Sequence, residues 1–368
     1  MTILASDIDN GAKNLLINCA EMAPGMRLLI IQEPSKHQYY DHKIGGNVAR
    51  IARTLGVQVE VLEVPFNPLV TDPDAALSAK MADADRVMFF ARLGDQLRFR
   101  ASPKNSYAVM SYALDADMLA SSFGQVDYRA FVELKRIVNQ AFSNADEVHV
   151  TCPIGTDFRG PGARFGEDDG DTTVKRFPLS VFAPIPSEGY SGRVAQVGFL
   201  ASTGSQTYEP PACEIEKTLF VEISDSRITG FEGSKRDVDA ARAHYDHVAS
   251  LFDLDRDYVH SWHAGIHPGC AYTKPANFYY DRWSNGAFGN PRILHLHTCG
   301  RNPPGEISLN IIDPTVRIDG VAAWDAGRLH PERIAGGKEL LGAYEDLADL
   351  FANPVRQCGI GPSGRLEY

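Results

Sequence analysis

Two histidine-rich segments, Tyr258-Val259-His260-Ser261-Trp262-His263-Ala264-Gly265-Ile266-His267-Pro268-Gly269 and Arg292-Ile293-Leu294-His295-Leu296-His297-Thr298-Cys299-Gly300, contain five of the eleven histidines of the 368-residue chain. No other part of the sequence has metal-binding side chains at this density. We therefore take these segments as the candidate site and the rest of the chain as the scaffold that positions them.

The second segment has the pattern of a short strand. Residues 292–298 alternate apolar and polar side chains over most of their length and contain no glycine or proline, which is typical of a strand. Because successive side chains of a strand point to opposite faces, Ile293, His295 and His297 are expected on one face. Two neighbouring imidazoles on one face can bind the same metal ion. A strand with two solvent-facing histidines is the alternative.

The first segment favours the metal. Gly265, Pro268 and Gly269 interrupt it, so a helical His-x-x-x-His face is disfavoured and a strand that runs into a turn is expected. Its three histidines then lie at the exit of a strand and are followed within about thirty residues by the same-face pair. Together the two segments predict a metal site.

The composition is that of a soluble globular protein. The chain is 44% hydrophobic and 23% charged, and it is long enough for two domains with cores of their own. Its net charge of -11 argues against a general nucleic-acid-binding protein, because binding phosphates requires basic patches. No apolar run approaches the roughly 18 residues of a membrane span. We therefore expect neither nucleic acid nor membrane as a partner.

The N-terminus and the cysteines predict a cytoplasmic protein. Residues 1–7 lack the basic and apolar regions of a secretion signal. The six cysteines show no Cys-x-x-Cys spacing, which suits a reducing compartment. Cys270 and Cys299, the two nearest to the histidines, are expected to be buried or to line a pocket rather than to bind metal.

The first 150 residues alternate helix and strand patterns. We expect helices at 9–21, 44–55 and 128–142, and strands at 27–31, 57–64, 86–90, 107–112 and 147–150. This alternation predicts an α/β domain with an open, mostly parallel sheet. No Gly-x-Gly-x-x-Gly follows the first strand, so no dinucleotide site is expected there.

Residues 151–368 are expected to form a second, α+β domain that carries the metal site. Strands at 173–182 and 192–200, a hairpin of 218–224 with 227–231, and a helix at 237–252 precede the histidines. A strand pair within 307–319 and a closing helix at 338–351 follow them.

With these residues in place, the chain resembles the thermophilic metallo-aminopeptidases (aminopeptidase T) and, more closely, the 2,5-dihydroxypyridine 5,6-dioxygenases. The segment 154–158, Ile-Gly-Thr-Asp-Phe, is similar to the family's Gly-Ser/Thr-Asp strand end. The segment 177–184, Phe-Pro-Leu-Ser-Val-Phe-Ala-Pro, is similar to its Pro-x-Gly-Glu-Val-Phe-x-x-Pro loop. The resemblance covers most of the chain and is specific in the C-terminal half. It implies an aminopeptidase T type of metal-site domain and a homo-oligomer.

Within this resemblance the family's metal ligands have changed. Ser180 stands where the peptidases have a metal-binding Glu, His263 replaces a second Glu, and Ser308 and Asn310 replace a His-x-Asp pair. A hydroxyl and an amide are poor ligands beside an imidazole. We therefore expect the metal on the imidazoles of the two segments: His263, His295 and His297, with His260 or His267 as a fourth ligand or a catalytic group.

Substrate contacts are expected on the strand at 307–312 and around it. Ser308 and Asn310 share a face of that strand and can hydrogen-bond a ring hydroxyl or a carboxylate. Ser180 is a further candidate through the resemblance. Aromatic residues near the site could enclose an aromatic substrate, although core packing is their commoner role: Tyr279, Tyr280, Trp262 and Trp283.

Three functions remain open from the sequence. The preferred one is a mononuclear non-haem iron(II) dioxygenase that opens a hydroxylated aromatic ring with O₂, because three neutral ligands leave positions on the metal for substrate and O₂. The second is a zinc or manganese hydrolase of an amide or amine, with Asp281, Glu306 or Asp313 as the base. The third is a non-catalytic member of the fold.

Overall fold

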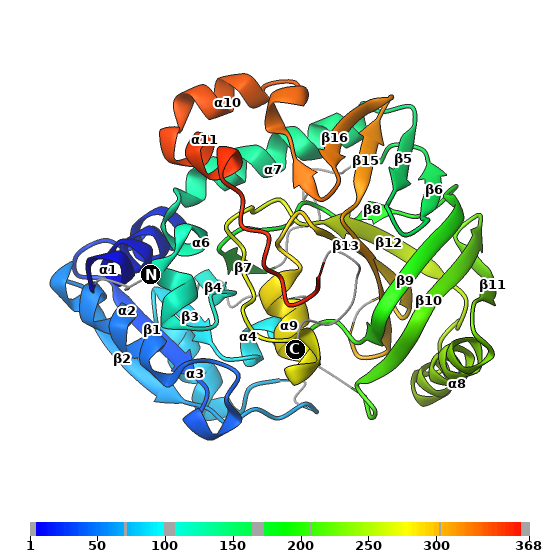
Figure 1. Cartoon of the computed structure of the whole chain (residues 1–368). Coiled ribbons are helices and arrows are strands. Elements are labelled where there is room, and N and C mark those ends of the chain that lie inside the picture. The colour runs from blue at the N-terminus through cyan, green and yellow to red at the C-terminus, as the bar shows by residue number, and fades with distance from the viewer. Residues whose placement is uncertain are drawn as a thin grey trace. The chain divides into compact units, whose positions relative to one another are not determined.

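The computed structural model describes residues 5–69, 72–98, 107–163, 173–205, 208–301 and 303–361. The chain divides into two compact units, Met1–Val132 with Asp171–Leu179 and Glu133–Gly170 with Ser180–Tyr368. Each unit is built on its own sheet (Figure 1). The units do not coincide with the boundary expected at residue 150, because residues 133–150 belong to the second unit and a later strand returns to the first.

The first unit has a parallel sheet, as predicted. Its strands lie in the order β2-β1-β3-β4-β7 and all neighbours run parallel. The interior strand β1 (Arg27–Gln32) is buried from Leu28 to Ile31, as its uninterrupted apolar run requires in a sheet covered on both faces. The other strands are β2 (Gln58–Glu63), β3 (Arg86–Phe90), β4 (Tyr107–Ser111) and β7 (Val174–Phe177).

Several helices of the first unit begin at polar caps. The Asp41 carboxylate accepts a hydrogen bond from the Lys43 amide, and the Asp74 carboxylate accepts one from the Leu77 amide, which satisfies amides that the first turn leaves unpaired. The described helices are α1 (Ala5–Lys13), its π-helical continuation Asn14–Cys19, α2 (His42–Thr54), α3 (Ala75–Asp83), α4 (Leu93–Leu97), α5 (Ala116–Ala120) and α6 (Ser122–Gln125), with a 3-10 turn at Ser35–His37.

The second unit has a curled antiparallel sheet (Figure 1). Its order is β17-β16-β15-β5-β6-β9-β14-β13-β12-β8, with β10 pairing β9 and β11 pairing β10. The strands are β5 (Val148–Thr151), β6 (Asp157–Gly160), β8 (Ile185–Pro186), β9 (Ser191–Ala201), β10 (Ala212–Ser224), β11 (Arg227–Glu232), β12 (Val259–Ala264), β13 (Ile293–Cys299), β14 (Glu306–Ile312), β15 (Thr315–Ile318), β16 (Val321–Asp325) and β17 (Arg328–Leu329).

Two expectations for this unit were wrong in detail. The strands within 307–319 form, but β14 pairs with β13 and β9 while β15 pairs with β5 and β16, so they are not a hairpin. The expected closing helix is two helices, α10 (Gly337–Ala343) and α11 (Glu345–Ala352), because the backbone at Tyr344 is extended. Periodicity alone does not reveal either break.

The remaining helices of the second unit are α7 (Tyr128–Ser143), whose first residues belong to the first unit, α8 (Lys235–Phe252) and α9 (Tyr280–Ala287), with 3-10 turns at Ala276–Phe278 and Pro331–Arg333. Asp237 in the first turn of α8 accepts hydrogen bonds from the amides of Glu216 and Lys217. This ties α8 to the irregular part of β10. None of the described helices is long and apolar enough to cross a membrane.

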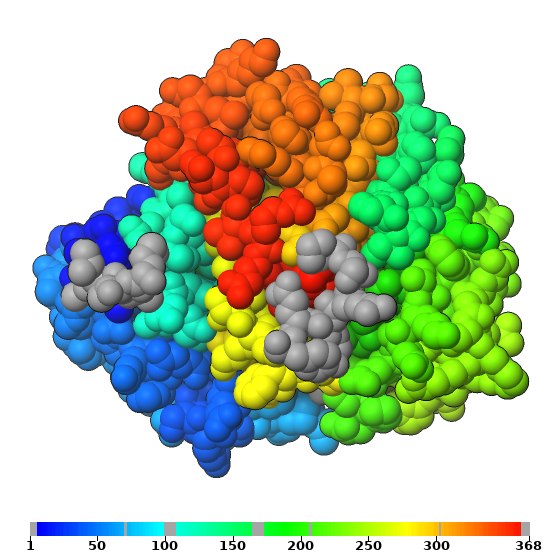
Figure 2. Space-filling model, in the orientation of Figure 1, coloured from blue at the N-terminus to red at the C-terminus, as the bar shows by residue number. Residues whose placement is uncertain are grey.

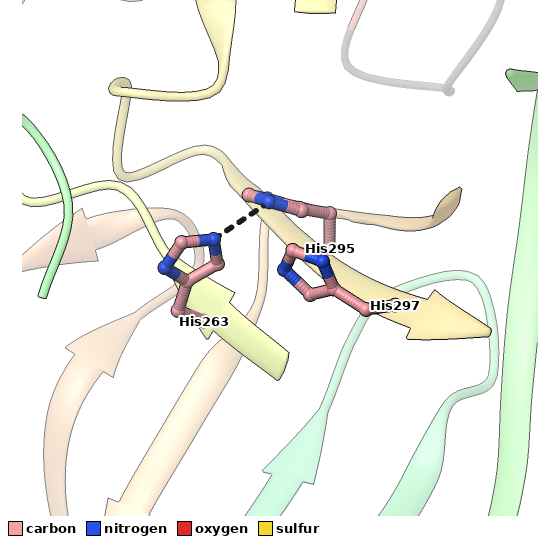
Figure 3. A group of neighbouring side chains, drawn as sticks. All are labelled: His263, His295 and His297. Atoms are coloured by element: carbon pink, nitrogen blue, oxygen red, sulfur yellow. Dashed lines mark hydrogen bonds between the residues drawn. The ribbon is translucent and has the colours of Figure 1, made fainter. Parts of the chain in front are cut away.

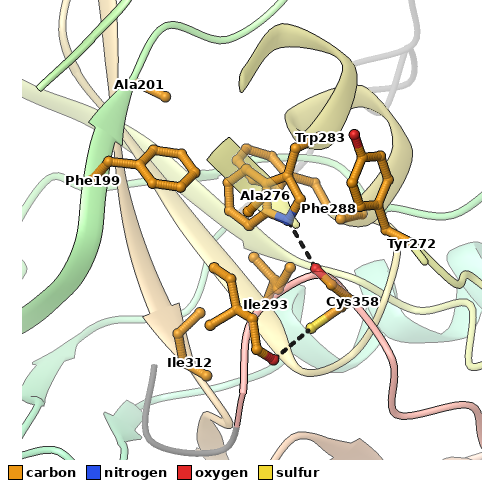
Figure 4. Close-up of a cluster of buried hydrophobic side chains, with 11 residues drawn as sticks. Phe199, Ala201, Tyr272, Ala276, Trp283, Phe288, Ile293, Ile312 and Cys358 are labelled. Atoms are coloured by element: carbon orange, nitrogen blue, oxygen red, sulfur yellow. Dashed lines mark hydrogen bonds between the residues drawn. The ribbon is translucent and has the colours of Figure 1, made fainter. Parts of the chain in front are cut away.

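A buried apolar cluster adjoins β13 and β14 (Figure 4). It contains Phe199 of β9, Trp283 of α9, Phe288, Ile293 and Ile312, together with Cys358 and Ile360 near the C-terminus. The indole nitrogen of Trp283 donates to the Cys358 carbonyl at 2.8 Å. Figure 2 shows the C-terminal segment in red against the yellow residues of α9 and its preceding loop. The segment at Cys358 and Ile360 is therefore part of the apolar cluster that packs against β13 and β14.

Candidate metal centre

Three of the five histidines converge on one face of the antiparallel sheet. His263 of β12 lies directly opposite His295 of β13, and His297 follows on the same face of β13 (Figure 3). The Nε2 atoms of His263 and His295 are 2.7 Å apart. One ligand atom from each of the three rings lies within 4.8 Å of the others. The predicted same-face arrangement of His295 and His297 is thus confirmed, and of the three histidines in the first segment only His263 joins them.

Hydrogen bonds to the far side of the His263 ring fix its orientation. Nδ1 lies 3.0 Å from the carbonyl oxygen of Phe182. A carbonyl only accepts, so Nδ1 carries the proton and Nε2 presents a lone pair to the group. The Phe182 ring stands edge-on to the imidazole, and the Phe288 ring lies 4.2 Å from that of His295 between centroids. The imidazoles therefore have apolar neighbours.

The His297 ring is oriented by a carboxylate. Its Nδ1 lies 2.5 Å from Oε1 of Glu306, a side chain with only 1% exposure. Its Nε2 is buried and has no hydrogen-bond partner among the described residues. An imidazole with Nδ1 beside a carbonyl or carboxylate and Nε2 available is the arrangement that metal-binding histidines adopt.

The three imidazoles fit a divalent transition-metal ion. Metal–nitrogen bonds of about 2.1 Å hold ligating nitrogens roughly 3.0–3.4 Å apart. The His263–His295 separation of 2.7 Å therefore has to open by a few tenths of an ångström, which small side-chain rotations supply. Among the described residues, these three histidines form the group of histidine, cysteine or carboxylate side chains whose ligand atoms lie close enough together to bind one metal ion.

His260 and His267 lie outside the group. His260 occupies the irregularity between Val259 and Ser261 in β12, and its Nε2 contacts the Cys299 carbonyl at 2.9 Å. Burial lowers the pKa of His260. His267 is fully buried, and its Nδ1 accepts from the Gly269 amide at 3.2 Å. A fourth-ligand or catalytic role for either stays a prediction.

Ser308 and Asn310 lie beside the histidines. In the β13–β14 pairing Ser308 is opposite His297 and Asn310 is opposite His295. The Ser308 hydroxyl donates to Asn310 Oδ1 at 2.8 Å, which orients the amide, while Asn310 Nδ2 is buried with no hydrogen-bond partner in the described residues. The Asn310 backbone amide donates to Gln196 Oε1. The sequence does not indicate Gln196 at the site, and it suggests Glu306 only as a candidate hydrolytic base and not as a partner of His297.

The other predicted contacts lie elsewhere or have partners of their own. Ser180 packs against Gly289, where a β-carbon would come within 2.5 Å of the Ser180 β-carbon. The Tyr280 hydroxyl donates to Glu214 and its ring packs on Phe199. The structure does not bring the Tyr280 hydroxyl into the histidine group, and a substrate role for Ser180 or Tyr280 stays a prediction.

Of the candidate bases, Glu306 contacts one of the three histidines, His297. The Asp313 carboxylate accepts hydrogen bonds from the guanidinium groups of Arg292 and Arg356. The Asp281 carboxylate accepts one from the side-chain amide of Asn285. Of the tryptophans, Trp262 lies on the face of β12 opposite His263, and Trp283 is in the apolar cluster. These two tryptophans therefore do not enclose the imidazoles.

The fold and the histidine group define a two-unit α/β protein with a candidate metal centre on its antiparallel sheet. No protein-family model matches the chain, and no curated protein matches it by sequence. Among solved structures, 2,5-dihydroxypyridine dioxygenase from Pseudomonas putida is similar, with a TM-score of 0.59 and 14% identity over 89% of this chain and 98% of that one. AmpT from Thermus thermophilus matches with a TM-score of 0.46 and 12% identity over 84% and 94%. The first likeness confirms the fold that the sequence resemblance implied.

Proposed function

We propose that the chain is a mononuclear iron(II) dioxygenase that opens an electron-rich hydroxylated aromatic or heteroaromatic ring, with His263, His295 and His297 as the metal ligands. The observation that carries the proposal is the convergence of three buried or partly buried imidazoles without a carboxylate among them. Iron(II) on such neutral ligands supplies a redox-active centre with free positions for a substrate oxygen and O₂. The dioxygenase fold supports the same reading.

The amide of Asn310 is the proposed contact to a substrate oxygen. Its Nδ2 is a buried donor without a partner in the described residues, and a buried unpaired donor is costly unless a ligand satisfies it. Ser308 keeps the amide in place by its hydrogen bond to Oδ1. A ring hydroxyl, a ring oxygen anion or a carboxylate provides the acceptor that this geometry requires.

Phe182 and Phe288 form the apolar border of the centre. Their rings contact His263 and His295 respectively. Such rings pack favourably against a flat aromatic molecule and keep water away from it. They do not provide a charged group for an amide or a peptide amine, so they favour an aromatic substrate.

A metal-dependent hydrolase requires a base beside the metal-bound water. Glu306 is the carboxylate nearest to the imidazoles, but it contacts His297 at Nδ1, on the opposite edge of the ring from Nε2. From that side it orients the ring and does not face the space that the three Nε2 atoms share. This position favours the dioxygenase over a hydrolase in which Glu306 is the base.

The test combines metal analysis with oxygen uptake. The protein is purified without oxygen, its metals are measured, and O₂ consumption is followed with dihydroxypyridines and aminophenols. We expect close to one iron per chain and O₂ uptake that depends on the ring. Zinc or manganese with O₂-independent turnover would support a hydrolase, and the absence of stoichiometric metal would refute both.

The ligand assignment is tested separately. His263→Ala, His295→Ala and His297→Ala should each remove most of the metal while unfolding stays cooperative, because the scaffold has its own core. His247→Ala is the matched control, since His247 is an exposed residue of α8. Full metal occupancy in all three variants would place the site elsewhere.

A further inference from the structure

Glu306 is a buried carboxylate whose ion-pair partner among the described residues is His297. It is the first residue of β14, on the same face as Ser308 and Asn310, and its side chain is 1% exposed. Among the described residues, its ion-pair partner is His297 and no lysine or arginine is paired with it. Removing a carboxylate from water is costly unless it is paired and hydrogen-bonded. Burying Glu306 therefore costs desolvation free energy that an apolar residue at this position would not.

The contact with Glu306 decides which nitrogen of His297 is available. A free imidazole exchanges its proton between Nδ1 and Nε2 and turns about its side-chain bonds. Nδ1 is the ring nitrogen that faces the Glu306 carboxylate, with Oε1 at 2.5 Å, although this ion-pair contact lacks hydrogen-bond geometry. A carboxylate favours a proton on the nitrogen that faces it. Nε2 is then left with its lone pair, and it is the buried nitrogen that has no partner in the described residues.

We propose that Glu306 is a positioning residue that holds His297 in the tautomer and orientation needed for metal binding, and so sets the affinity of the three-histidine centre. This inference rests on the proposed metal site. Glu306 is not itself a ligand, because it lies at Nδ1, away from Nε2. The printed geometry of the other two differs: His263 Nδ1 donates to the neutral carbonyl of Phe182, and His295 Nε2 lies against Nε2 of His263. His297 is thus the ligand whose basicity a carboxylate raises.

The test measures cobalt(II) binding to the whole chain by competition with a chelator, together with the visible spectrum of the bound cobalt. Glu306→Gln keeps the size of the side chain but can donate as well as accept, so it no longer enforces the tautomer. We expect its affinity for cobalt to fall about 10- to 100-fold with an altered spectrum. Glu306→Asp keeps the charge on a shorter side chain, so its affinity for cobalt should lie between those of the parent chain and Glu306→Gln.

The matched control is Glu332→Gln. Glu332 Oε1 lies 2.9 Å from Nδ1 of His330, outside the three-histidine group, so the same chemical change there should leave cobalt affinity within about twofold of the parent. Wild-type affinity and spectrum in Glu306→Gln would overturn the inference and leave the metal site standing. Absence of cobalt binding in the parent chain would overturn the metal site as well. If Glu306→Gln does not fold, Glu306→Asp decides: unchanged affinity refutes the positioning role, and an affinity lowered several-fold with native tryptophan emission supports it.

Discussion

Replacing Arg292 by methionine should destabilise the second unit by breaking the ion pair that anchors the start of β13. The Arg292 side chain is 3% exposed, and its Nε and Nη2 lie 2.7 and 3.0 Å from the two oxygens of Asp313. Its Nη1 donates to the carbonyls of Arg356 and Ile360 at 2.6 and 3.1 Å. Methionine keeps much of the apolar length and removes every one of these donors.

The expected loss is about 3 kcal/mol. Breaking a buried ion pair by removing one partner costs roughly 3–5 kcal/mol, because the other charge stays buried. Asp313 keeps Arg356 Nη2 at 2.9 Å, but that side chain is 48% exposed, so it compensates only in part and the lower end of the range applies. Asp313→Asn removes the remaining charge and tolerates the local φ of 50°. The double variant should therefore be more stable than the sum of the two single losses predicts, by about 1 kcal/mol or more. Couplings of this size are typical of residues in direct contact.

Tryptophan emission during urea unfolding is the assay. Trp262, Trp283 and Trp324 are the three tryptophans of the chain, and all lie fully buried in the second unit, so their emission reports that unit. The midpoint shift at constant slope gives the change in the free energy of unfolding. A loss below about 1 kcal/mol for Arg292→Met, or strict additivity in the double variant, would refute the reasoning.

Further predictions concern the site, the pH response and assembly. Asn310→Ala should weaken substrate binding by about 0.5–1.5 kcal/mol, more for a charged substrate, with metal content unchanged; binding measured under anaerobic conditions decides, and an unchanged dissociation constant contradicts the contact. Ser308→His with Asn310→Asp should tighten or rearrange metal binding, because the added ligands face the imidazoles; identical binding and activity would count against this. Burial lowers the pKa of His244 to about 4. Between pH 6.5 and 4, the imidazole therefore binds a proton in the unfolded chain but stays neutral in the native chain. Stability from this group is complete above pH 6.5 and decreases as pH falls toward 4, by about 2 kcal/mol at pH 5, and His244→Gln should flatten that decrease in urea titrations. Light scattering at micromolar concentration should show a homo-oligomer, and a monomer would contradict the resemblance on this point.

Strand periodicity predicted the placement of the two histidines of β13, whereas the choice of His263 on β12 came from the family resemblance. The period of a strand is enough to place His295 and His297 on one face. Choosing among His260, His263 and His267 requires the register of β12 against β13, and a one-residue slip reverses every side chain. The irregularity at His260 changes that register locally. No local pattern in the sequence indicates it, because it depends on the pairing of two strands.

The contacts of two residues around the candidate metal centre were not predicted for a related reason. The sequence suggests Glu306 only as a hydrolytic base, and its contact with His297 depends on the pairing of β13 with β14. Gln196 comes from β9, about a hundred residues earlier, and is not indicated at all. Each is one polar side chain within an apolar strand, which composition and periodicity treat as an exception. Similarly, β7 reads as a strand in the sequence, but its pairing with β4 in the first unit is a long-range choice. Local propensity does not carry information of this kind.

The antiparallel register turns the site into two rows of three side chains. One row is Ser261, His297 and Ser308; the other is His263, His295 and Asn310. Neighbours within a row are held at the spacing of adjacent strands by the backbone ladder and not by the side chains themselves. Substitutions within a row can therefore change which strand carries a given side chain, while the backbone stays in place. A sheet of this kind allows the charge and identity of the side chains at the candidate centre to change in small steps, each compatible with the same fold.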